Sequence, residues 1–285
     1  ELEESGYLVR IFSDDFTMEI NKKTGTIDSY RFAGSELIRT GPSPNFWRAP
    51  IDNDLGNRMP ERLGVWKDAG KNWKIIEASV ARVDSRTVTV TVEGEVPPSR
   101  SGFNLLYTVK SSGEVRIDAS FIPGKEGLPN LPRLGLKMTV SPEFQRVSWY
   151  GRGPHESYWD RKKGARVGVY GGSVDDQYVS YSQPQENGNK TDVRWAFFSS
   201  GEGPGLLVKG PPVFSFSARN FMDEDLDKAR HEHEMQKRDF VTLNLDHLQM
   251  GVGGDNSWGA RTHPEFRIPA DQYDFTLILR GAVEE

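Results

Sequence analysis

The 285-residue sequence is mildly acidic: it has 36 lysines and arginines against 41 aspartates and glutamates, a formal net charge of -5, and no cysteine. This balance does not suit nucleic acid or an anionic membrane surface as the main partner, and a neutral ligand fits better. No apolar run approaches the roughly 18 residues of a membrane span, and the missing cysteines exclude thiol chemistry and disulfides. A disulfide-free protein is stable in either redox setting, so the compartment, cytoplasmic or periplasmic, stays open.

The first residues, Glu1-Leu-Glu-Glu-Ser-Gly6, contain neither an initiator methionine nor a signal-peptide core. We therefore expect this sequence to be a segment of a longer chain. Its length would allow two domains, but large all-β units of this size often fold as one. Because the sequence contains no repeat and no low-complexity linker, we expect a single domain over residues 1–285.

Short runs with a two-residue period recur along the chain, separated by Gly, Pro, Asn and Asp, which is typical of antiparallel strands. Residues 16–20 and 26–32 predict a hairpin whose turn contains Gly25, and residues 33–38 add a further turn and strand. The predicted later pairs and strands are 78–83 with 87–93, 102–110 with 114–121, 134–140 with 146–150, and then 193–199, 204–209, 213–218, 241–248 and 273–279. This spacing predicts an all-β fold, a large antiparallel sandwich.

One short helix is expected after Asn220, a favourable N-cap residue. Asp223 to Asp225 place negative charge in its first turn and Lys228 places positive charge later, which is the polarity that the helix dipole favours.

Two patterns suggest metal binding, and neither is sufficient. Asp52, Asp54 and the following glycine resemble the start of a calcium loop, but Leu63 stands where the loop needs its last acid. A buried loop in which Arg48, Asp52 and Asn53 satisfy backbone groups is the favoured interpretation. His231 and His233 provide only two ligands. We therefore predict no metal site in this chain.

Two polar segments carry candidate binding groups. Residues 149–160 combine aromatic side chains, an arginine and acceptors, including His155 and Glu156, in a loop shaped by Gly and Pro. The alternative is that these charges form ion pairs that hold the loop to the sheet. Residues 184–195 contain Glu186, which with His155 would supply an acid-base pair if the two lay close together.

The segment Asp246-His-Leu-Gln-Met-Gly-Val-Gly-Gly-Asp-Asn-Ser-Trp-Gly259 ends a predicted strand and places one tryptophan on a glycine-rich turn. Glycines permit positive φ and close approach of a ligand, Asp255 and Asn256 offer polar groups, and the indole of Trp258 offers an apolar face. This combination suits a sugar ring. The alternative is that Trp258 caps the core, since large aromatic side chains are mostly buried.

Four motifs in this order resemble the C-terminal, small-chain domain of bacterial β-galactosidases of glycoside hydrolase family 2. They are Pro44-Asn-Phe-Trp-Arg-Ala-Pro-Ile-Asp-Asn-Asp54, Tyr150-Gly-Arg-Gly-Pro-His-Glu-Ser-Tyr-Trp-Asp-Arg161, Pro184-Gln-Glu-Asn-Gly188 and Gly251-Val-Gly-Gly-Asp-Asn-Ser-Trp258. The resemblance covers almost the whole chain. It implies a very large antiparallel supersandwich related to the galactose mutarotases.

The resemblance also implies a division of labour. The catalytic glutamates of a retaining β-galactosidase, and its magnesium and sodium ions, would lie in a barrel domain of the same parent chain, so we expect this chain to have no catalytic residue and no cofactor and to be inactive alone. Its partners would be that barrel domain and a β-galactoside or its aglycone, in an enzyme that is often a homo-oligomer. Trp258 would contact the sugar or aglycone. The other candidate binding residues are Asp255, Asn256, His155 and Glu186.

Two other functions are considered from the sequence. The kinship with mutarotases suggests a stand-alone aldose epimerase that uses a His and Glu pair, although the five histidines give no convincing match to such a set. A purely structural or oligomerising module is the third possibility, in which the aromatic residues belong to the core and the interfaces.

Overall fold

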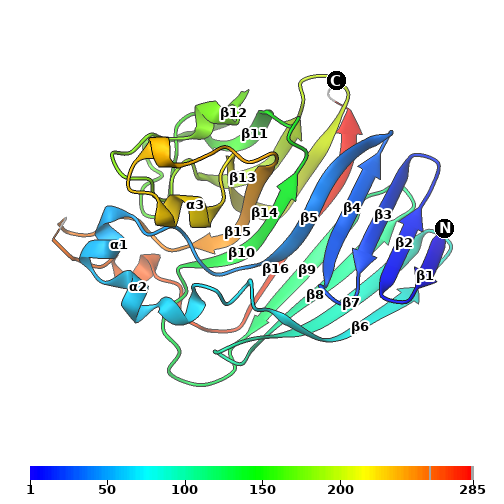
Figure 1. Ribbon diagram of the computed structural model, residues 1–285, viewed down its shortest axis with the longest axis horizontal. Coiled ribbons are helices and arrows are strands. Elements are labelled where there is room, and N and C mark those ends of the chain that lie inside the picture. Colours follow the sequence, from blue (N-terminus) through cyan, green and yellow to red (C-terminus); the bar gives the residue numbers. More distant parts are fainter. Residues whose placement is uncertain (257, 284–285) are drawn as a thin grey trace.

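The computed structural model describes residues 1–256 and 258–283, and in these residues sixteen strands form one curled antiparallel sheet (Figure 1). Along the sheet the strands follow the order β1-β2-β3-β4-β5-β10-β15-β14-β16-β9-β8-β7-β6, and β13, β11 and β12 extend from β14. The strands are β1 Leu2–Ser5, β2 Leu8–Phe12, β3 Phe16–Asn21, β4 Thr26–Phe32, β5 Ser35–Asn45, β6 Lys74–Arg82, β7 Thr87–Val96, β8 Ser101–Lys110, β9 Val115–Ile122, β10 Arg133–Val140, β11 Arg146–Gly153, β12 Arg166–Ser173, β13 Lys190–Ser199, β14 Pro204–Arg219, β15 Val241–Gln249 and β16 Tyr273–Val283.

The curl brings β1 to β5 over β6 to β9, and the space between these two layers holds the core (Figure 1). Strand alternation produces this arrangement, because every second residue of β3, β7, β8 and β9 is buried. Phe46 packs against Phe103 and Phe121 with ring centroids 5.6 and 5.7 Å apart. The Tyr30 hydroxyl joins the layers, since it donates to Gly113 O at 2.8 Å and accepts from Gly281 N at 2.9 Å.

The helices are short and lie at the margins of the sheet: α1 Asp52–Gly56, α2 Met59–Arg62 and α3 Asp223–Lys228. The expected helix after Asn220 is α3. Its N-cap is Met222 and not Asn220, because the Asn220 amide donates to the side chains of Gln145 and Asp175. The expectation of a single helix is wrong, since α1 and α2 are also present within residues 1–256 and 258–283. None of the helices in these ranges is long and apolar enough to span a bilayer.

Most predicted strands are present, but one predicted pair is wrong. Residues 134–140 do not pair with residues 146–150: β10 lies between β5 and β15, while β11 lies between β12 and β13. Both edges of β10 are therefore filled by strands distant in sequence, and six of its eight residues are buried. The predicted strands 204–209 and 213–218 are one strand, β14, whose first part pairs with β16 and whose last part pairs with β15.

Candidate functional site

The four sequence motifs meet at the end of the sheet where α1 and α2 lie, and Arg48 joins the first motif to the fourth. This buried guanidinium pairs with Asp54 at 3.0 Å and donates to the carbonyl oxygens of Met250 and Gly251 at 2.6 and 3.0 Å. Asn53 donates to Val252 O at 3.0 Å. The expectation that Arg48, Asp52 and Asn53 satisfy backbone groups of a buried loop is confirmed for Arg48 and Asn53. It is wrong for Asp52, which is exposed and whose carboxylate accepts a hydrogen bond from the Gln185 side chain at 3.3 Å. The carboxylate that resembled a calcium ligand, Asp54, is the counter-ion of Arg48.

The second motif holds the same loop from another side. The Asp160 carboxylate accepts hydrogen bonds from Val252 N at 3.0 Å and Gly253 N at 2.6 Å. A side chain at Gly251 would displace this carboxylate, because a Cβ at this position would lie 2.6 Å from Asp160 Oδ2. The start of the tryptophan-bearing loop is thus fixed by the charged side chains of Arg48 and Asp160.

The third motif is fixed to both of its neighbours. Gln185 accepts a hydrogen bond from Asp52 N at 3.2 Å, and Glu156 of the second motif accepts one from Gly188 N at 2.8 Å. Glu156 also pairs with Arg161 and accepts from the Tyr181 hydroxyl. These contacts match the interpretation in which charges of residues 149–160 hold the loop to the rest of the fold.

Trp258 projects from this anchored loop into solvent. Its side chain is 93% exposed, which excludes a core role for it within this chain. Asn256 Oδ1 accepts a hydrogen bond from Trp258 N at 2.8 Å. Gly259 has a φ of +109°, and a Cβ at this position would lie 2.7 Å from Gly56 O. The loop, orange in Figure 1, extends past α1 at the end of the molecule opposite the N-terminus. An indole this exposed leaves its whole apolar surface free for contact with a ligand or another domain.

Asp255 lies beside this tryptophan and pairs with His263, whose Nε2 is 2.7 Å from Asp255 Oδ1. The hydrogen bond that Asp255 accepts from His263, together with the charge of this carboxylate, raises the pKa of His263. Both side chains are exposed. Asp255 and Asn256 therefore shape and charge the surface around Trp258, and the predicted residues Trp258, Asp255 and Asn256 lie together.

His155 and Glu186 lie in different settings. His155 is exposed, whereas Glu186 is only 1% exposed. The Glu186 carboxylate forms ion pairs with Arg133 and Arg219, both at 3.1 Å. Among the described residues no histidine is hydrogen-bonded or ion-paired to Glu186. Glu186 therefore does not lie on an accessible rim, and it forms no acid-base pair with His155.

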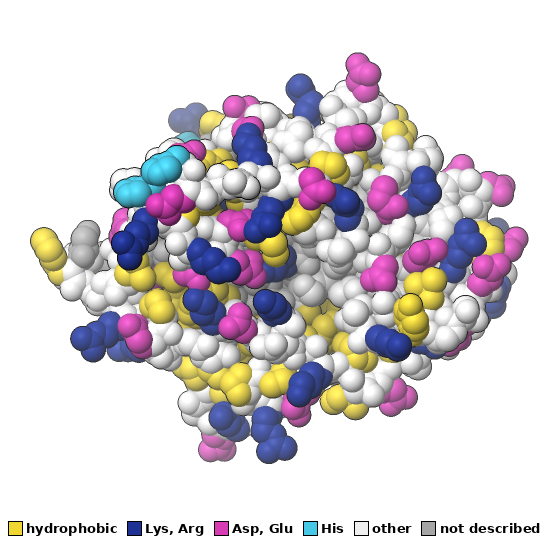
Figure 2. All heavy atoms as spheres, viewed as in Figure 1, with side chains coloured by type: hydrophobic (Ala, Val, Ile, Leu, Met, Phe, Trp, Pro, Cys, Tyr) yellow, Lys and Arg dark blue, Asp and Glu magenta, His cyan; other side chains and the backbone are white. Residues whose placement is uncertain are grey.

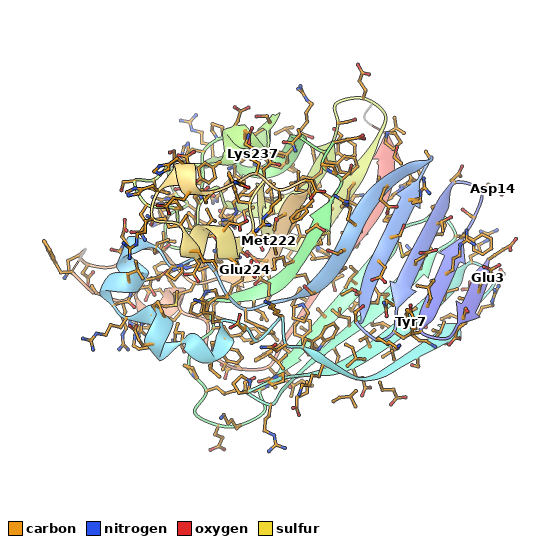
Figure 3. All side chains as sticks on the ribbon, in the orientation of Figure 1. Glu3, Tyr7, Asp14, Met222, Glu224 and Lys237 are labelled. Atoms are coloured by element: carbon orange, nitrogen blue, oxygen red, sulfur yellow. The ribbon has the colours of Figure 1, made fainter. Side chains whose placement is uncertain are left out.

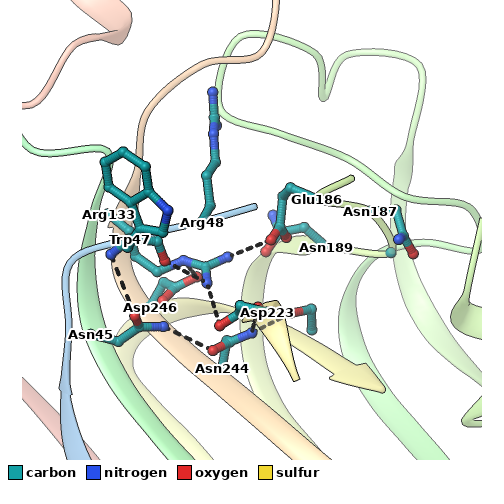
Figure 4. A network of polar contacts seen from close by, with 12 residues as sticks. Asn45, Trp47, Arg48, Arg133, Glu186, Asn187, Asn189, Asp223, Asn244 and Asp246 are labelled. Atoms are coloured by element: carbon teal, nitrogen blue, oxygen red, sulfur yellow. Dashed lines mark hydrogen bonds and ion pairs between the residues drawn. The ribbon is translucent and has the colours of Figure 1, made fainter. Parts of the chain in front are cut away.

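Glu186 belongs to a buried charge network behind the site, which sequence reasoning missed (Figure 4). Arg133 pairs with Glu186 and with Asp246, both at 3.1 Å, and it lies 3.8 Å from Asp223. Arg219 pairs with Asp223 at 3.3 Å. Asn45 and Asn244 continue the network by hydrogen bonding to each other at 2.9 Å. The available signal was the run of polar residues at inward positions of predicted strands, such as Asn244 and Asp246.

Burial and charge act on the network carboxylates in opposite directions. Burial raises the pKa of Asp246 to about 7, with Arg133 opposing the rise and the carboxylates of Glu186 and Asp223 adding to it. Burial would also raise the pKa of Asp223, but the positive charges of Arg219, Lys137 and Arg133 hold it below its ordinary value. Asp246 is thus a buried carboxyl group that changes its charge near neutrality.

Replacing Asp246 with Asn is expected to remove a pH dependence of stability. The raised pKa means that the folded protein holds a proton that the unfolded chain, with an ordinary Asp pKa of about 3.9, has lost. This contribution to stability is complete below about pH 4 and is lost as the pH rises through about 7, by about 1.4 kcal/mol per pH unit at the steepest. Urea unfolding of both proteins between pH 4 and 8 measures it. If the free energies of unfolding of the two proteins changed with pH in the same way over this range, the raised pKa of Asp246 would be contradicted.

No three His, Asp or Glu side chains in residues 1–256 and 258–283 are grouped in a way that could hold a metal ion. His231 and His233 stack on each other with ring centroids 5.5 Å apart, and both are exposed. On the face drawn in Figure 2, basic and acidic side chains are interspersed.

Solved structures with the same architecture include two proteins that are named as sugar epimerases. A putative aldose 1-epimerase from Escherichia coli K12 superposes with a TM-score of 0.51 at 11% identity over 97% of this chain and 99% of that chain. The galactose 1-epimerase from Lactobacillus acidophilus gives a TM-score of 0.51 at 8% identity over 100% of this chain and 98% of that chain. At such identities the likeness concerns the fold alone. By fold the chain is a galactose mutarotase-like all-β protein, as predicted.

Within this fold class, the chain belongs to the beta-galactosidase small chain family, whose sequence model matches residues 12–279. It is 40% identical over 268 residues to the β-galactosidase of Priestia megaterium, a match that covers 93% of this chain and 26% of that protein. With the β-galactosidase of Streptococcus thermophilus it shares 34% identity over 279 residues, covering 97% of this chain and 27% of that one. The chain thus spans about a quarter of the length of these curated relatives.

Proposed function

We propose that this small-chain domain completes the substrate pocket of a retaining β-galactosidase that hydrolyses terminal β-D-galactosides. In this proposal the catalytic glutamates and any metal ions lie in the part of the enzyme outside this chain, and Trp258 contacts the sugar or its aglycone. The observation that carries the proposal is the pairing of a 93% exposed indole with a loop fixed by Arg48 and Asp160.

The physical argument starts from the exposed tryptophan. Leaving so large an apolar surface in water is unfavourable unless a partner covers it, and a loop fixed by two charged side chains pre-organises the indole for that contact. Stacking an indole on the apolar face of a sugar adds on the order of 1 kcal/mol beyond area burial. Asp255 and Asn256 add polar groups beside it, and His155 is a further exposed candidate for polar contact.

A complementation assay tests this function. The chain is mixed with a β-galactosidase from which the matching quarter has been removed, and hydrolysis of an aryl β-galactoside is compared with that of each fragment alone. Activity in the mixture only is the expected result. Full activity of the large fragment alone would reduce this chain to a structural role, and activity of this chain alone would overturn the proposal.

A second assay, polarimetry of galactose, separates this function from sugar epimerisation. If the chain were an epimerase, it would accelerate the α/β equilibration of galactose on its own. We expect a rate equal to that in buffer, because Glu186 is held by Arg133 and Arg219 and has no histidine partner among the described residues.

A further inference from the structure

Three strands in the described part of the chain, β1, β6 and β12, have a neighbouring strand on one side only. Such an edge offers unpaired backbone N–H and C=O groups to another strand, and proteins protect it with short strands, charged side chains or bulges. β1 is protected because it has only four residues, two of them glutamates. β6 has a register irregularity between Ile75 and Glu77 and a charged side chain at each end.

β12 has none of these protections at its free edge (Figure 1). It has eight residues, pairs with β11 without a register shift, and contains no proline and no charged residue after Arg166. Val167 and Val169 are 42% and 67% exposed on the same face of the strand. Tyr150 of β11 lies directly opposite Val169 and is 37% exposed, so the three side chains form one apolar patch beside the edge. A strand that paired with β12 would satisfy its backbone groups and cover part of this patch.

The two ends of β12 carry opposite charges. Lys163 and Arg166 are exposed at its start, and neither has a carboxylate partner in the part of the chain that the structure describes. Asp176 is exposed at its end, where its carboxylate accepts a hydrogen bond from Ser173 N at 2.9 Å. In an antiparallel pair the start of one strand lies beside the end of the other. A second copy of β12 would therefore bring the acidic end of each strand to the basic end of the other, twice by symmetry.

We propose that two copies of this chain associate through β12, antiparallel and about a two-fold axis, so that the curled sheet continues from one copy into the other. Backbone hydrogen bonds provide the pairing, and Val167 and Val169 of the two copies cover one another. The charge pattern selects a second copy as the partner, because an identical strand has the matching acidic and basic ends by symmetry. This surface does not depend on the proposed function, since β12 contributes no residue to the loop of Trp258.

Sedimentation velocity of the 285-residue chain over a range of concentrations tests the pairing. The wild type is expected to approach twice the 32.1 kDa mass of one chain as the concentration rises. Val169→Lys places like charges close to the two-fold axis and is expected to raise the dissociation constant of the dimer at least about tenfold. Val83→Lys is the matched control, because Val83 is 62% exposed outside β12, and it is expected to dimerise like the wild type. An equimolar mixture of Val169→Lys and Val169→Glu is expected to restore the dimer, since opposite charges then meet, which also shows that the lysine variant is folded.

Other results would contradict this surface. A wild type that stays monomeric at every concentration would overturn the inference, and so would a mixture of the lysine and glutamate variants that stays monomeric. A dimer that persists in Val169→Lys, or that is lost equally in Val83→Lys, would place the contact elsewhere on the molecule and overturn it as well.

Thiol labelling distinguishes a second copy from another occupant of the edge. Because the sequence contains no cysteine, Val169→Cys introduces a single thiol. Its reaction with a maleimide is expected to slow as the concentration of the chain itself rises, while Val83→Cys reacts at a constant rate. Protection of Val169→Cys that appears only when the large β-galactosidase fragment is added would assign this edge to another part of the parent enzyme and overturn the inference.

Discussion

Replacing Arg133 with methionine is expected to lower the free energy of unfolding by about 3–5 kcal/mol. Arg133 is fully buried and is the cation shared by Glu186 and Asp246, with Asp223 close by. Methionine fills a similar volume but leaves three buried carboxyl groups with too little positive charge. Arg219 and Lys137 still face Glu186 and Asp223, but Asp246 loses the guanidinium that pairs with it. Urea unfolding at pH 7 measures the change.

Arg116→Met is the matched control for this prediction. Arg116 also pairs with an aspartate, Asp118 at 2.7 Å, but its side chain is 48% exposed and water screens the charge. Its loss is expected to cost less than about 1 kcal/mol. Equal losses in the two variants would contradict the view that burial gives the Arg133 network its importance.

Replacing Trp258 with alanine is expected to raise KM for an aryl β-galactoside about tenfold and to leave kcat nearly unchanged. The assay uses the P. megaterium β-galactosidase in which the matching segment is replaced by this chain. The expected loss is about 1.4 kcal/mol of binding, the size of an aromatic contact together with part of its buried area. Because the indole would contact the substrate and not the reacting atoms, the ground state and the transition state should lose it equally.

Two further variants make the Trp258 result specific. Trp258→Phe keeps an aromatic face and is expected to recover most of the affinity. Tyr7→Ala removes another exposed aromatic side chain at the opposite end of the molecule, where Figure 3 labels it beside Glu3 and Asp14, and is expected to change nothing. An unchanged KM in Trp258→Ala over several aryl galactosides would contradict a substrate contact.

The sequence predicted the fold class because its strands carry a clear two-residue period and its turns contain Gly, Asn and Pro. Alternation of buried and exposed positions in β7 and β8 is regular, so those strands were predicted correctly, and so were the pairs of β6 with β7 and of β8 with β9. The sequence did not predict the pairing of strands that are distant in the chain, such as β10 with β5 and β15. Strand β12 was missed because its glycines at 168, 171 and 172 weaken the pattern.

The candidate site was predicted only in part. The acid-amide turn with Trp258 was recognised from residue types, and the exposure of the indole follows from the loop that carries it. The role of Glu186 depends on Arg133 and Arg219, which lie 53 positions before it and 33 positions after it in the sequence. No local pattern reports such contacts.

The most direct test of the central claim, that Trp258 lines a substrate pocket formed with another domain, is hydroxyl-radical footprinting read by mass spectrometry. In the free chain Trp258 is expected to be oxidised rapidly, as its exposure requires. Addition of the large β-galactosidase fragment should slow this oxidation, and a bound galactoside should slow it further, while oxidation of Tyr7 stays constant. If Trp258 were oxidised as fast in the assembled, sugar-bound enzyme as in the free chain, it would not line such a pocket.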